Sequence, residues 1–368
     1  MDYVREAVAA MHISGDGPFA HRCEALLQSL LGSPRVLLTT SCTHALEMAA
    51  LLLDIGEGDE VVGPSFTFVS CFNAFVLRGA RPVFADVRPD TMNLDPASLE
   101  RRITPRTRAI VAVHYAGVAC DMDTIGRIAE ARGIPIVEDT AHGLFGAWRG
   151  RPLGSFGRLA ALSFHETKNV TCGEGGALVV NDPALAERAE ILREKGTDRS
   201  KFFRGEVDKY SWRDVGSSYV PSDILAAFLF AQLERRERIQ RDRLARWHTY
   251  RDALAPWAEA SGVGLPVIPD GCEHPGHLFH LLLPSGEARD AFLEHMREQE
   301  IGAVFHYLPL HLSDMGRRFG GRPGDCPVTE RVSERLVRLP LSGGLTDDEQ
   351  ARVIAAVLAF APVRHSIP

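Results

Sequence analysis

The feature that most constrains the fold of this chain is an alternation of short β-branched runs with helical segments between residues 35 and 195. Apolar runs such as RVLLTT, DEVVGP and RAIVAVHY are each followed by segments whose apolar residues recur at helical spacing. This alternation predicts an α/β fold, with a mostly parallel central sheet covered by helices on both faces. Ligands of such sheets bind at the carboxyl ends of the strands, so the residues at strand ends are the first candidates for function.

The pattern changes after residue 196. Residues 197–221 are rich in glycine, charge and aromatic side chains, and they exceed the length of an ordinary connection, which predicts a functional loop. A long helical segment over residues 222–257 leads to a second group of elements, HLFHLLLP, ARDAFLEHMREQE and IGAVFHY. With 368 residues and 45% hydrophobic content, the chain is expected to form a large domain over 1–250 and a smaller C-terminal α/β domain over 251–368.

Charge and cysteine content exclude several classes of function. The net charge of −7 argues against nucleic-acid binding, and the basic run Leu233–Trp247 contains acidic residues at the spacing of a solvated helix face. The seven cysteines are widely spread and form no C-x-x-C pair, which predicts reduced thiols. The sequence has no secretory signal and no apolar run long enough to span a membrane, so we expect a cytoplasmic protein without membrane partners.

The segment CEHPGHLFH raises the question of a metal site, because Cys272, His274, His277 and His280 are all potential ligands. If HLFHLLLP is a strand, His277 and His280 point to opposite faces, and we predict no metal. No G-x-G-x-x-G follows a predicted strand and no Walker-type G-x-x-x-x-G-K is present, which argues against dinucleotide and P-loop sites.

Two predicted strands end in groups that suit a charged ligand. In TTSCTHALEMAA, a helix begins at Ser41, Cys42 and Thr43, and its free backbone N–H groups suit a phosphate. In IPIVEDTAHG, Asp139 could hold a protonated ring nitrogen, and His142 follows three residues later. Simple helix capping explains each motif equally well when the motif is taken alone.

Lys168 lies in SFHETKNVTCGEGG, four residues after the apolar run LAALSF. Ser163 offers a hydroxyl there, and the GEGG turn permits close approach of the backbone. Phe68 in PSFTFVS lies at a strand-to-helix turn and could cover a planar ligand. Alone, Lys168 could be a surface residue and Phe68 a core residue. Together with the phosphate turn and the carboxylate, they predict a site for pyridoxal 5′-phosphate (PLP), whose chemistry requires a Schiff-base lysine and an acidic partner for the ring nitrogen.

The sequence resembles the sugar aminotransferases of the DegT/DnrJ/EryC1/StrS family, which are fold-type I PLP enzymes. The resemblance runs over nearly the whole chain, through strings such as LEMAALLLDI, PSFTFVS, VHYAGVAC, SFHETKN, FFRGEVDKY and FHYLPLH. It implies an enzyme that takes an amino group from L-glutamate and transfers it to C4 of a nucleotide-linked 4-keto-6-deoxyhexose, in the first place dTDP-4-keto-6-deoxy-D-glucose. Related dehydratases carry histidine at the position of the Schiff-base lysine, so Lys168 argues against that reaction.

The resemblance also assigns roles to individual residues. Lys168 is expected to form the Schiff base and move protons, and Asp139 to pair with the ring nitrogen. The other implied cofactor contacts are His142 beside the ring hydroxyl, Phe68 on the ring face, and Cys42, Thr43 and Ser163 at the phosphate.

A homodimer with shared active sites is implied as well, because in this family the loop matching GSSYVPSD reaches the phosphate of the partner subunit. Many relatives have asparagine and arginine in that loop, whereas this chain has Ser218 and Val220. Relatives usually also carry more residues before the segment that matches DYVREAV, including a proline-rich stretch, so a shortened start is expected.

Three segments are candidates for holding the sugar nucleotide: Phe202–Trp212 with Tyr210, the GDG turn with Asp16, and HYLPLH with Tyr307 and His311. The choice between dTDP and UDP, and between galacto and gluco products, stays open. So do two other functions, amination of another ketosugar or a cyclitol, and a non-enzymatic regulator that senses a sugar nucleotide on the same fold.

Overall fold

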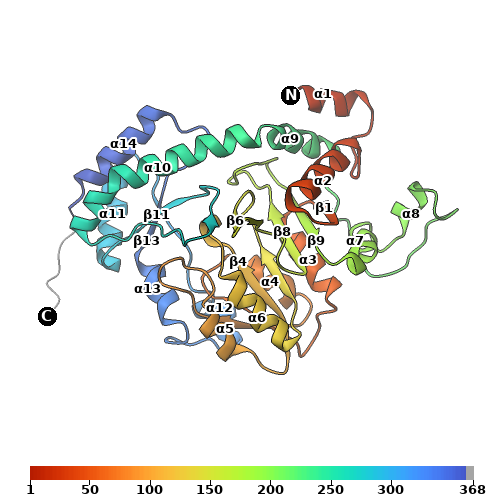
Figure 1. The fold of residues 1–368 in the computed structure, drawn as a ribbon, viewed down its shortest axis with the longest axis horizontal. Helices are drawn as coiled ribbons and strands as arrows, with labels where there is room; N and C mark the ends of the chain where they lie inside the picture. The colour runs from red at the N-terminus through yellow and green to blue at the C-terminus, as the bar shows by residue number, and fades with distance from the viewer. Residues whose placement is uncertain (362–368) are drawn as a thin grey trace.

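A seven-stranded sheet with the order β1-β9-β8-β5-β4-β2-β3 forms the centre of the protein in a computed structural model, which describes residues 1–361 (Figure 1). Its neighbours pair in parallel except at β9, which runs antiparallel to both β1 and β8. The α/β fold with a mostly parallel sheet is thereby confirmed. The strands are β1 (Arg35–Thr39), β2 (Glu60–Pro64), β3 (Arg81–Ala85), β4 (Thr107–Val113), β5 (Ile136–Asp139), β8 (Leu159–Ser163) and β9 (Gly176–Val180).

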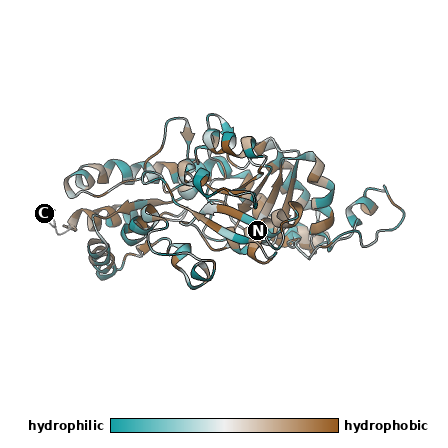
Figure 2. Cartoon of the chain, turned by 90° about the horizontal axis from the view of Figure 1, so that it is seen from below, coloured by the Kyte–Doolittle hydropathy of each residue, from teal (hydrophilic) through white to brown (hydrophobic). Residues whose placement is uncertain are grey.

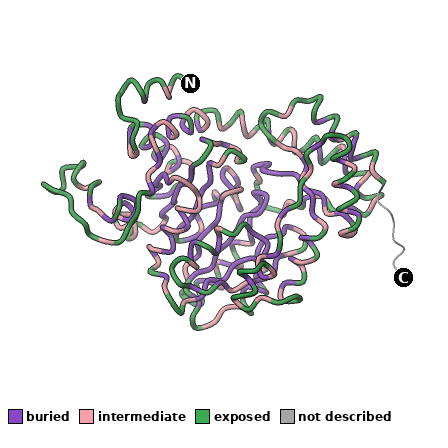
Figure 3. Tube along the Cα trace, turned by 180° about the vertical axis from the view of Figure 1, so that it is seen from behind, coloured by how far each residue is buried: buried purple, intermediate pink, exposed green. Residues whose placement is uncertain are grey.

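Helices cover both faces of this sheet because successive strand residues point to opposite sides. Leu37 packs in one apolar cluster with residues of α3, α4 and α7, whereas Val36 and Leu38 pack in another with α2 and α9. The strands are mainly hydrophobic, and buried residues concentrate in them (Figures 2 and 3). The helices of this part are α1 (Asp2–Ala9), α2 (Pro18–Leu31), α3 (Cys42–Leu52), α4 (Ser70–Val76), α5 (Pro96–Arg102), α6 (Met122–Arg132), α7 (Ala186–Arg193), α8 (Arg199–Phe203) and α9 (Asp223–Glu234).

A second, smaller unit follows α10 (Arg236–Ser261), which runs from α9 to the far side of the molecule (Figure 1). The helical segment expected over 222–257 is therefore two helices, α9 and α10. The unit has its own apolar core around Trp247 and Phe279 and a sheet of order β11-β13-β12. Its elements are β11 (Phe279–Leu282), α11 (Gly286–Glu298), β12 (Val304–Phe305), α12 (Asp314–Arg318), α13 (Pro327–Arg335), β13 (Leu336–Leu339) and α14 (Asp347–Ala359).

Residue 250, the predicted domain boundary, lies inside α10, and the division into two domains stays a prediction. The last part of the predicted C-terminal domain, 362–368, lies outside the described residues. A small sheet of β6 (Ala147–Trp148), β7 (Arg151–Pro152) and β10 (Cys272–Glu273) joins the two units through pairing of β10 with β6. Within residues 1–361, no helix has both the length and the apolar character needed to cross a bilayer.

The predicted functional loop forms a projecting arm, which we define as residues 197–215. It contains α8 and extends away from the body of the protein (Figure 1). Most of its residues are exposed (Figure 3). Two of its aromatic side chains, Phe203 and Trp212, are 66% and 81% exposed. Because large aromatic side chains are costly to leave in water, this arm is a candidate contact surface.

Candidate active site

A cavity of about 1400 Å³ opens at the carboxyl ends of the central strands, between the two units. Its size exceeds the range of about 300–1,000 Å³ that is usual for small-ligand sites, which leaves room for a cofactor and a large substrate. The predicted site residues that line it are Cys42, Thr43, Phe68, Asp139, His142, Ser163, Lys168 and Tyr307. Sequence positions far apart are thus brought to one place.

The N-terminus of α3 forms one end of this cavity. Ser41 caps the helix by accepting a hydrogen bond from the backbone N–H of His44, at 3.1 Å. The hydroxyls of Thr43 and Ser70, which lie in the first turns of α3 and α4, are 2.8 Å apart. Free N–H groups, a helix dipole and two hydroxyls make a site that suits a phosphate.

Gly176 allows β9 to pass directly beneath this turn. A Cβ at position 176 would lie 2.3 Å from the carbonyl carbon of Ser41 and 2.4 Å from the backbone nitrogen of Cys42. Any other residue at position 176 would therefore push the turn at Ser41 and Cys42 away from the sheet. The expectation that the GEGG turn permits close backbone approach agrees with this geometry.

Asp139 ends β5 and points its carboxylate into the cavity. Its Oδ1 accepts a hydrogen bond from the backbone N–H of Ala141 at 3.0 Å, and its Oδ2 accepts one from the thiol of Cys71 at 2.8 Å. Burial raises the pKa of Cys71 well above its ordinary value, and the charge of Asp139 raises it further. Cys71 therefore remains a thiol donor, and the carboxylate is held in one orientation.

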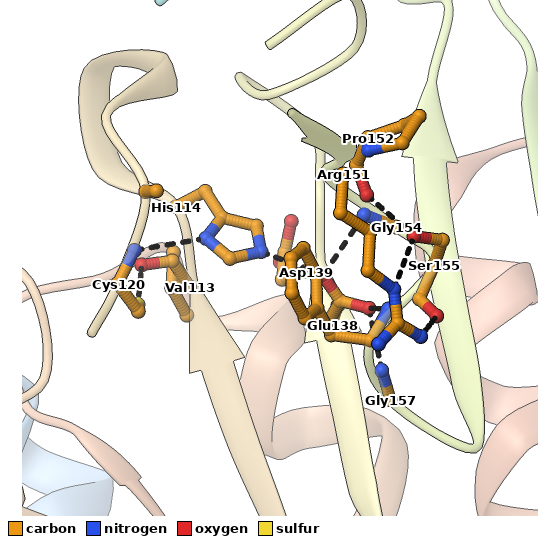
Figure 4. Close-up of polar contacts among 12 residues, drawn as sticks. Val113, His114, Cys120, Glu138, Asp139, Arg151, Pro152, Gly154, Ser155 and Gly157 are labelled. Carbon is orange, nitrogen blue, oxygen red and sulfur yellow. Dashed lines mark hydrogen bonds and ion pairs between the residues drawn. The ribbon is translucent and has the colours of Figure 1, made fainter. Parts of the chain in front are cut away.

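The neighbouring residue Glu138 holds this strand end in place from the other side of the sheet (Figure 4). It is fully buried and accepts hydrogen bonds from the backbone N–H groups of Gly154, Phe156 and Gly157 at 2.6–2.8 Å. His114 Nε2 lies 2.8 Å from the same carboxylate. Glu138 thus ties β5 to β4 and to the turn before β8, and this network fixes the position at which Asp139 enters the cavity.

The amine of Lys168 lies in the cavity without a hydrogen bond or ion pair to any residue in 1–361. Burial lowers its pKa below the ordinary value, and the positive charge of Arg338 acts in the same direction, whereas Asp139 opposes the shift. A lysine of lowered pKa has a larger fraction of the uncharged amine at neutral pH. Such an amine is a competent nucleophile for a carbonyl carbon.

His142 lies beside these groups and stacks on His277, with ring centroids 4.2 Å apart and the planes inclined by 24°. Burial lowers the pKa of His142 well below its ordinary value, and the charge of Lys168 adds to this. His142 is therefore an uncharged ring. Phe68 is mostly exposed at the mouth of the cavity, with its ring centroid 6.5 Å from that of Tyr307.

Two residues predicted to hold the sugar nucleotide do not line the cavity of their own chain. Asp16 does not line the cavity, because it forms an ion pair with the buried guanidinium of Arg193. His311 is 0% exposed, and its ring nitrogens contact Ser65 Oγ at 2.7 Å and Glu330 Oε1 at 3.0 Å. Both ring nitrogens of His311 thus have partners within the protein.

Two other predicted residues lie away from the cavity of their own chain. Tyr210 is on the arm and packs against Phe202, with ring centroids 5.7 Å apart. Ser218 follows the arm and forms an isolated β-bridge with Glu194. Neither residue lines the cavity, so any role in catalysis requires the site of a second subunit.

Sequence reasoning did not assign several residues that line the cavity. They are Ser70, Asn169, His277, His306 and Arg338. Arg338 lies in the middle of the otherwise apolar strand β13, and its Nε is buried without a hydrogen-bond partner. A charged residue inside the run LVRLP was a signal that could have identified it. Within residues 1–361, no group of three or more His, Cys, Asp or Glu side chains is placed to hold a metal ion.

Comparison with known proteins agrees with this geometry. A model of the "DegT/DnrJ/EryC1/StrS aminotransferase family" matches residues 1–358. The chain belongs to this family. It is 33% identical over 349 residues to the spore coat polysaccharide biosynthesis protein SpsC of Bacillus subtilis, which covers 93% of this chain and 89% of SpsC.

Two solved structures are similar over almost the whole chain. DesV of S. venezuelae, whose structure was solved in complex with a ketimine intermediate, is 32% identical, with a TM-score of 0.89 over 99% of this chain and 94% of DesV. The 3-amino-5-hydroxybenzoic acid synthase is 27% identical, with a TM-score of 0.87 over 97% of this chain and 94% of that protein. The predicted family and the fold-type I architecture are confirmed.

The cavity fits the PLP cofactor of this family. It combines an unpaired amine, a fixed carboxylate and a helix N-terminus in a space large enough for a phosphorylated pyridine. The protein is thus a PLP-dependent sugar aminotransferase. The alternative of a non-enzymatic regulator is set aside, because the chain belongs to an aminotransferase family.

Proposed function

We propose that the protein transfers an amino group from L-glutamate to C4 of a nucleotide-linked 4-keto-6-deoxyhexose, with dTDP-4-keto-6-deoxy-D-glucose as the first candidate substrate. The observation that carries the proposal is the free amine of Lys168, which lies in one cavity with Asp139 and has space left for a nucleotide sugar. Bound PLP supplies an aldehyde that condenses with amines and a ring that accepts electrons from the adjacent carbon.

The residues around the amine then have distinct tasks. Lys168 Nζ accepts the proton from Cα of glutamate, and its lowered pKa makes the free base available for this step. The carboxylate of Asp139 holds a proton on the ring nitrogen by charge attraction. The N-terminus of α3, with Thr43 and Ser70, binds the phosphate, and Ser163 lines the same cavity.

Arg338 supports an amino acid as the donor. Its guanidinium lines the cavity, and it has no ion pair within residues 1–361. A partly buried cation without a partner is stabilised by a bound anion, and a guanidinium fits a carboxylate with two hydrogen bonds. We assign Arg338 to a carboxylate of glutamate in the first half of the reaction.

The arm supports a homodimer with shared active sites. Ser218 and Tyr210 lie outside the cavity of their own chain, and the arm exposes large aromatic side chains. In the proposed dimer, the arm packs on the partner subunit and Ser218 approaches the phosphate site of that subunit.

The test is direct. Purified protein with PLP is first mixed with glutamate, and the visible absorbance of the bound cofactor is followed. The ketosugar dTDP-4-keto-6-deoxy-D-glucose is then added, and the configuration of the product at C4 is identified from NMR coupling constants. We expect an amino sugar, whereas Lys168→Ala should lower turnover by about 10³-fold or more. A UDP-linked ketosugar and a cyclitol ketone are compared in parallel. Amination of the cyclitol alone would refute the proposed substrate and favour the alternative that the similarity to 3-amino-5-hydroxybenzoic acid synthase leaves open.

A further inference from the structure

His277 has no role in the reaction described above, although it lines the same cavity as Lys168. It belongs to the segment CEHPGHLFH. Its ring stacks on His142, and its Nδ1 lies 2.8 Å from Oδ1 of Asn169, the residue directly after Lys168. The position next to two groups of the active site raises the question of what its second nitrogen does.

The hydrogen bonds of Asn169 decide which nitrogen of His277 carries the proton. Asn169 Nδ2 donates to the carbonyl of Pro275 at 2.9 Å. Because a carbonyl oxygen only accepts, the nitrogen and oxygen of the Asn169 side-chain amide cannot exchange places. Oδ1 of Asn169 therefore faces His277 and must accept a hydrogen bond. His277 Nδ1 is the donor, so the lone pair of the neutral ring lies on Nε2.

The lone pair on Nε2 is available to a ligand. Burial lowers the pKa of His277 well below its ordinary value, and the charges of Lys168 and Arg243 lower it further. The ring therefore stays neutral at working pH. Nε2 forms no hydrogen bond with any residue in 1–361. Part of its surface is accessible, because it is not one of the fully buried side-chain atoms that lack a partner. It is consequently a free acceptor that faces the cavity.

We propose that His277 Nε2 accepts a hydrogen bond from a hydroxyl group of the hexose ring of the substrate, and so selects the sugar in the second half of the reaction. The proposal rests on the proposed function. A hydroxyl can donate to a lone pair. The carboxylates of glutamate have no proton to donate, and its amino group is the group that reacts at the cofactor. Arg338 has the opposite polarity, so the cavity offers one group for each of the two substrates.

Two substitutions separate the two nitrogens of His277. His277→Asn can keep the donor to Asn169 but lacks an acceptor at the position of Nε2, whereas His277→Gln places an amide oxygen near that position. We expect His277→Asn to weaken sugar-nucleotide binding about tenfold, as for a lost hydrogen bond in a site that excludes water. His277→Gln should restore most of the loss. His274→Asn is the matched control, because His274 lies in the same loop but packs on Trp247 outside the cavity.

Three measurements test the proposal. The dissociation constant of the nucleotide ketosugar is measured by calorimetry in a Lys168→Ala background, and the two half-reactions are followed separately by the absorbance of the cofactor. Substrates that each lack one ring hydroxyl are also compared. The substrate that lacks the recognised hydroxyl should bind more weakly than the full substrate to the unsubstituted protein. His277→Asn should not weaken the binding of that substrate further, because the hydroxyl and the lone pair form one interaction.

The outcomes are distinct. Equal losses in the glutamate and sugar half-reactions of His277→Asn would show that Nε2 serves the amine of Lys168 instead, and would overturn the proposal. Unchanged sugar binding in His277→Asn would overturn it too. If the unsubstituted protein aminates no nucleotide sugar at all, the proposed function fails first, independently of any substitution.

Discussion

At the scale of single residues, the site depends on a directed chain of hydrogen bonds that ends at Asp139. The thiol of Cys71 donates to the carboxylate, so the hydroxyl of Thr67, 2.9 Å from the same sulfur, must act as the donor to it. Each group has one possible direction of donation, so the carboxylate is held in one orientation, and within residues 1–361 it forms no ion pair. This arrangement leaves the charge of Asp139 available to a protonated ring nitrogen.

We predict that Asp139→Asn weakens cofactor binding and lowers turnover. Without the negative charge, the proton affinity of the ring nitrogen falls by about one pKa unit or more, and the affinity of the protonated cofactor falls about tenfold with it. The dissociation constant is measured by titration of absorbance, and turnover in the coupled assay. Asp123→Asn, on the exposed side of α6, is the control. Near-normal binding by Asp139→Asn would mean that another group holds the ring.

At the scale of elements, the site is built where helices and strands end. The N-terminus of α3 approaches β9 because position 176 has no side chain, and β5 delivers Asp139 because Glu138 fixes the preceding peptide units. Three backbone donors and one imidazole converge on the carboxylate of Glu138 (Figure 4). A buried charge is stable only when it is paired in this way.

Glu138→Gln should therefore destabilise the fold. An amide has one oxygen where the carboxylate has two, so backbone donors in the turn before β8 lose their partner. The expected loss is about 3 kcal/mol of unfolding free energy, in the range for removing one partner of a buried charged network. Urea unfolding measures it, and Glu130→Gln on the exposed face of α6 serves as the reference. A change no larger than that of Glu130→Gln would show that the network does not stabilise the protein.

At the scale of the whole molecule, the arm over residues 197–215 is tied to α7 by ion pairs such as Lys201–Glu187 and Arg204–Glu190, but its large aromatic side chains are left exposed. It projects from the body, exposes Phe203 and Trp212, and leads to Ser218, which lies outside the cavity (Figure 1). The proposed dimer explains all three features, since apolar side chains on an extended arm gain free energy by packing on a second subunit.

Shared active sites can be tested by complementation. Lys168→Ala and Ser218→Asp should each be inactive, the second because the added carboxylate repels the phosphate of the partner site. Co-expression of the two variants should recover about a quarter of the active sites, since half of the dimers are mixed and each has one intact site. Sedimentation velocity confirms that both variants remain dimers. No recovery in mixed dimers would argue that each site is built by one chain.

The sheet architecture and the main reactive groups could be predicted from the sequence, because both depend on patterns within short segments of the chain. Periodicity decides strand or helix, and Asp139 and Lys168 stand where strands end, so an α/β sheet and a PLP site could be predicted. The sequence did not show which predicted residues lie outside the cavity of their own chain, because their polar partners are distant in sequence. Asp16 pairs with Arg193, and His311 contacts Ser65, and no local pattern shows such a pairing.

Only the tertiary structure placed the smaller unit against the strand ends. His277 and Arg338 come from that unit, more than a hundred residues after Lys168, and the packing of β11 and β13 beneath α10 decides that both reach the cavity. The sequence by itself determined the chemistry that this protein can perform, because reactive groups and strand ends are encoded nearby in the chain. The tertiary structure decided which further groups line the site, including those that we propose to recognise the substrates, because these groups meet only when distant segments pack together.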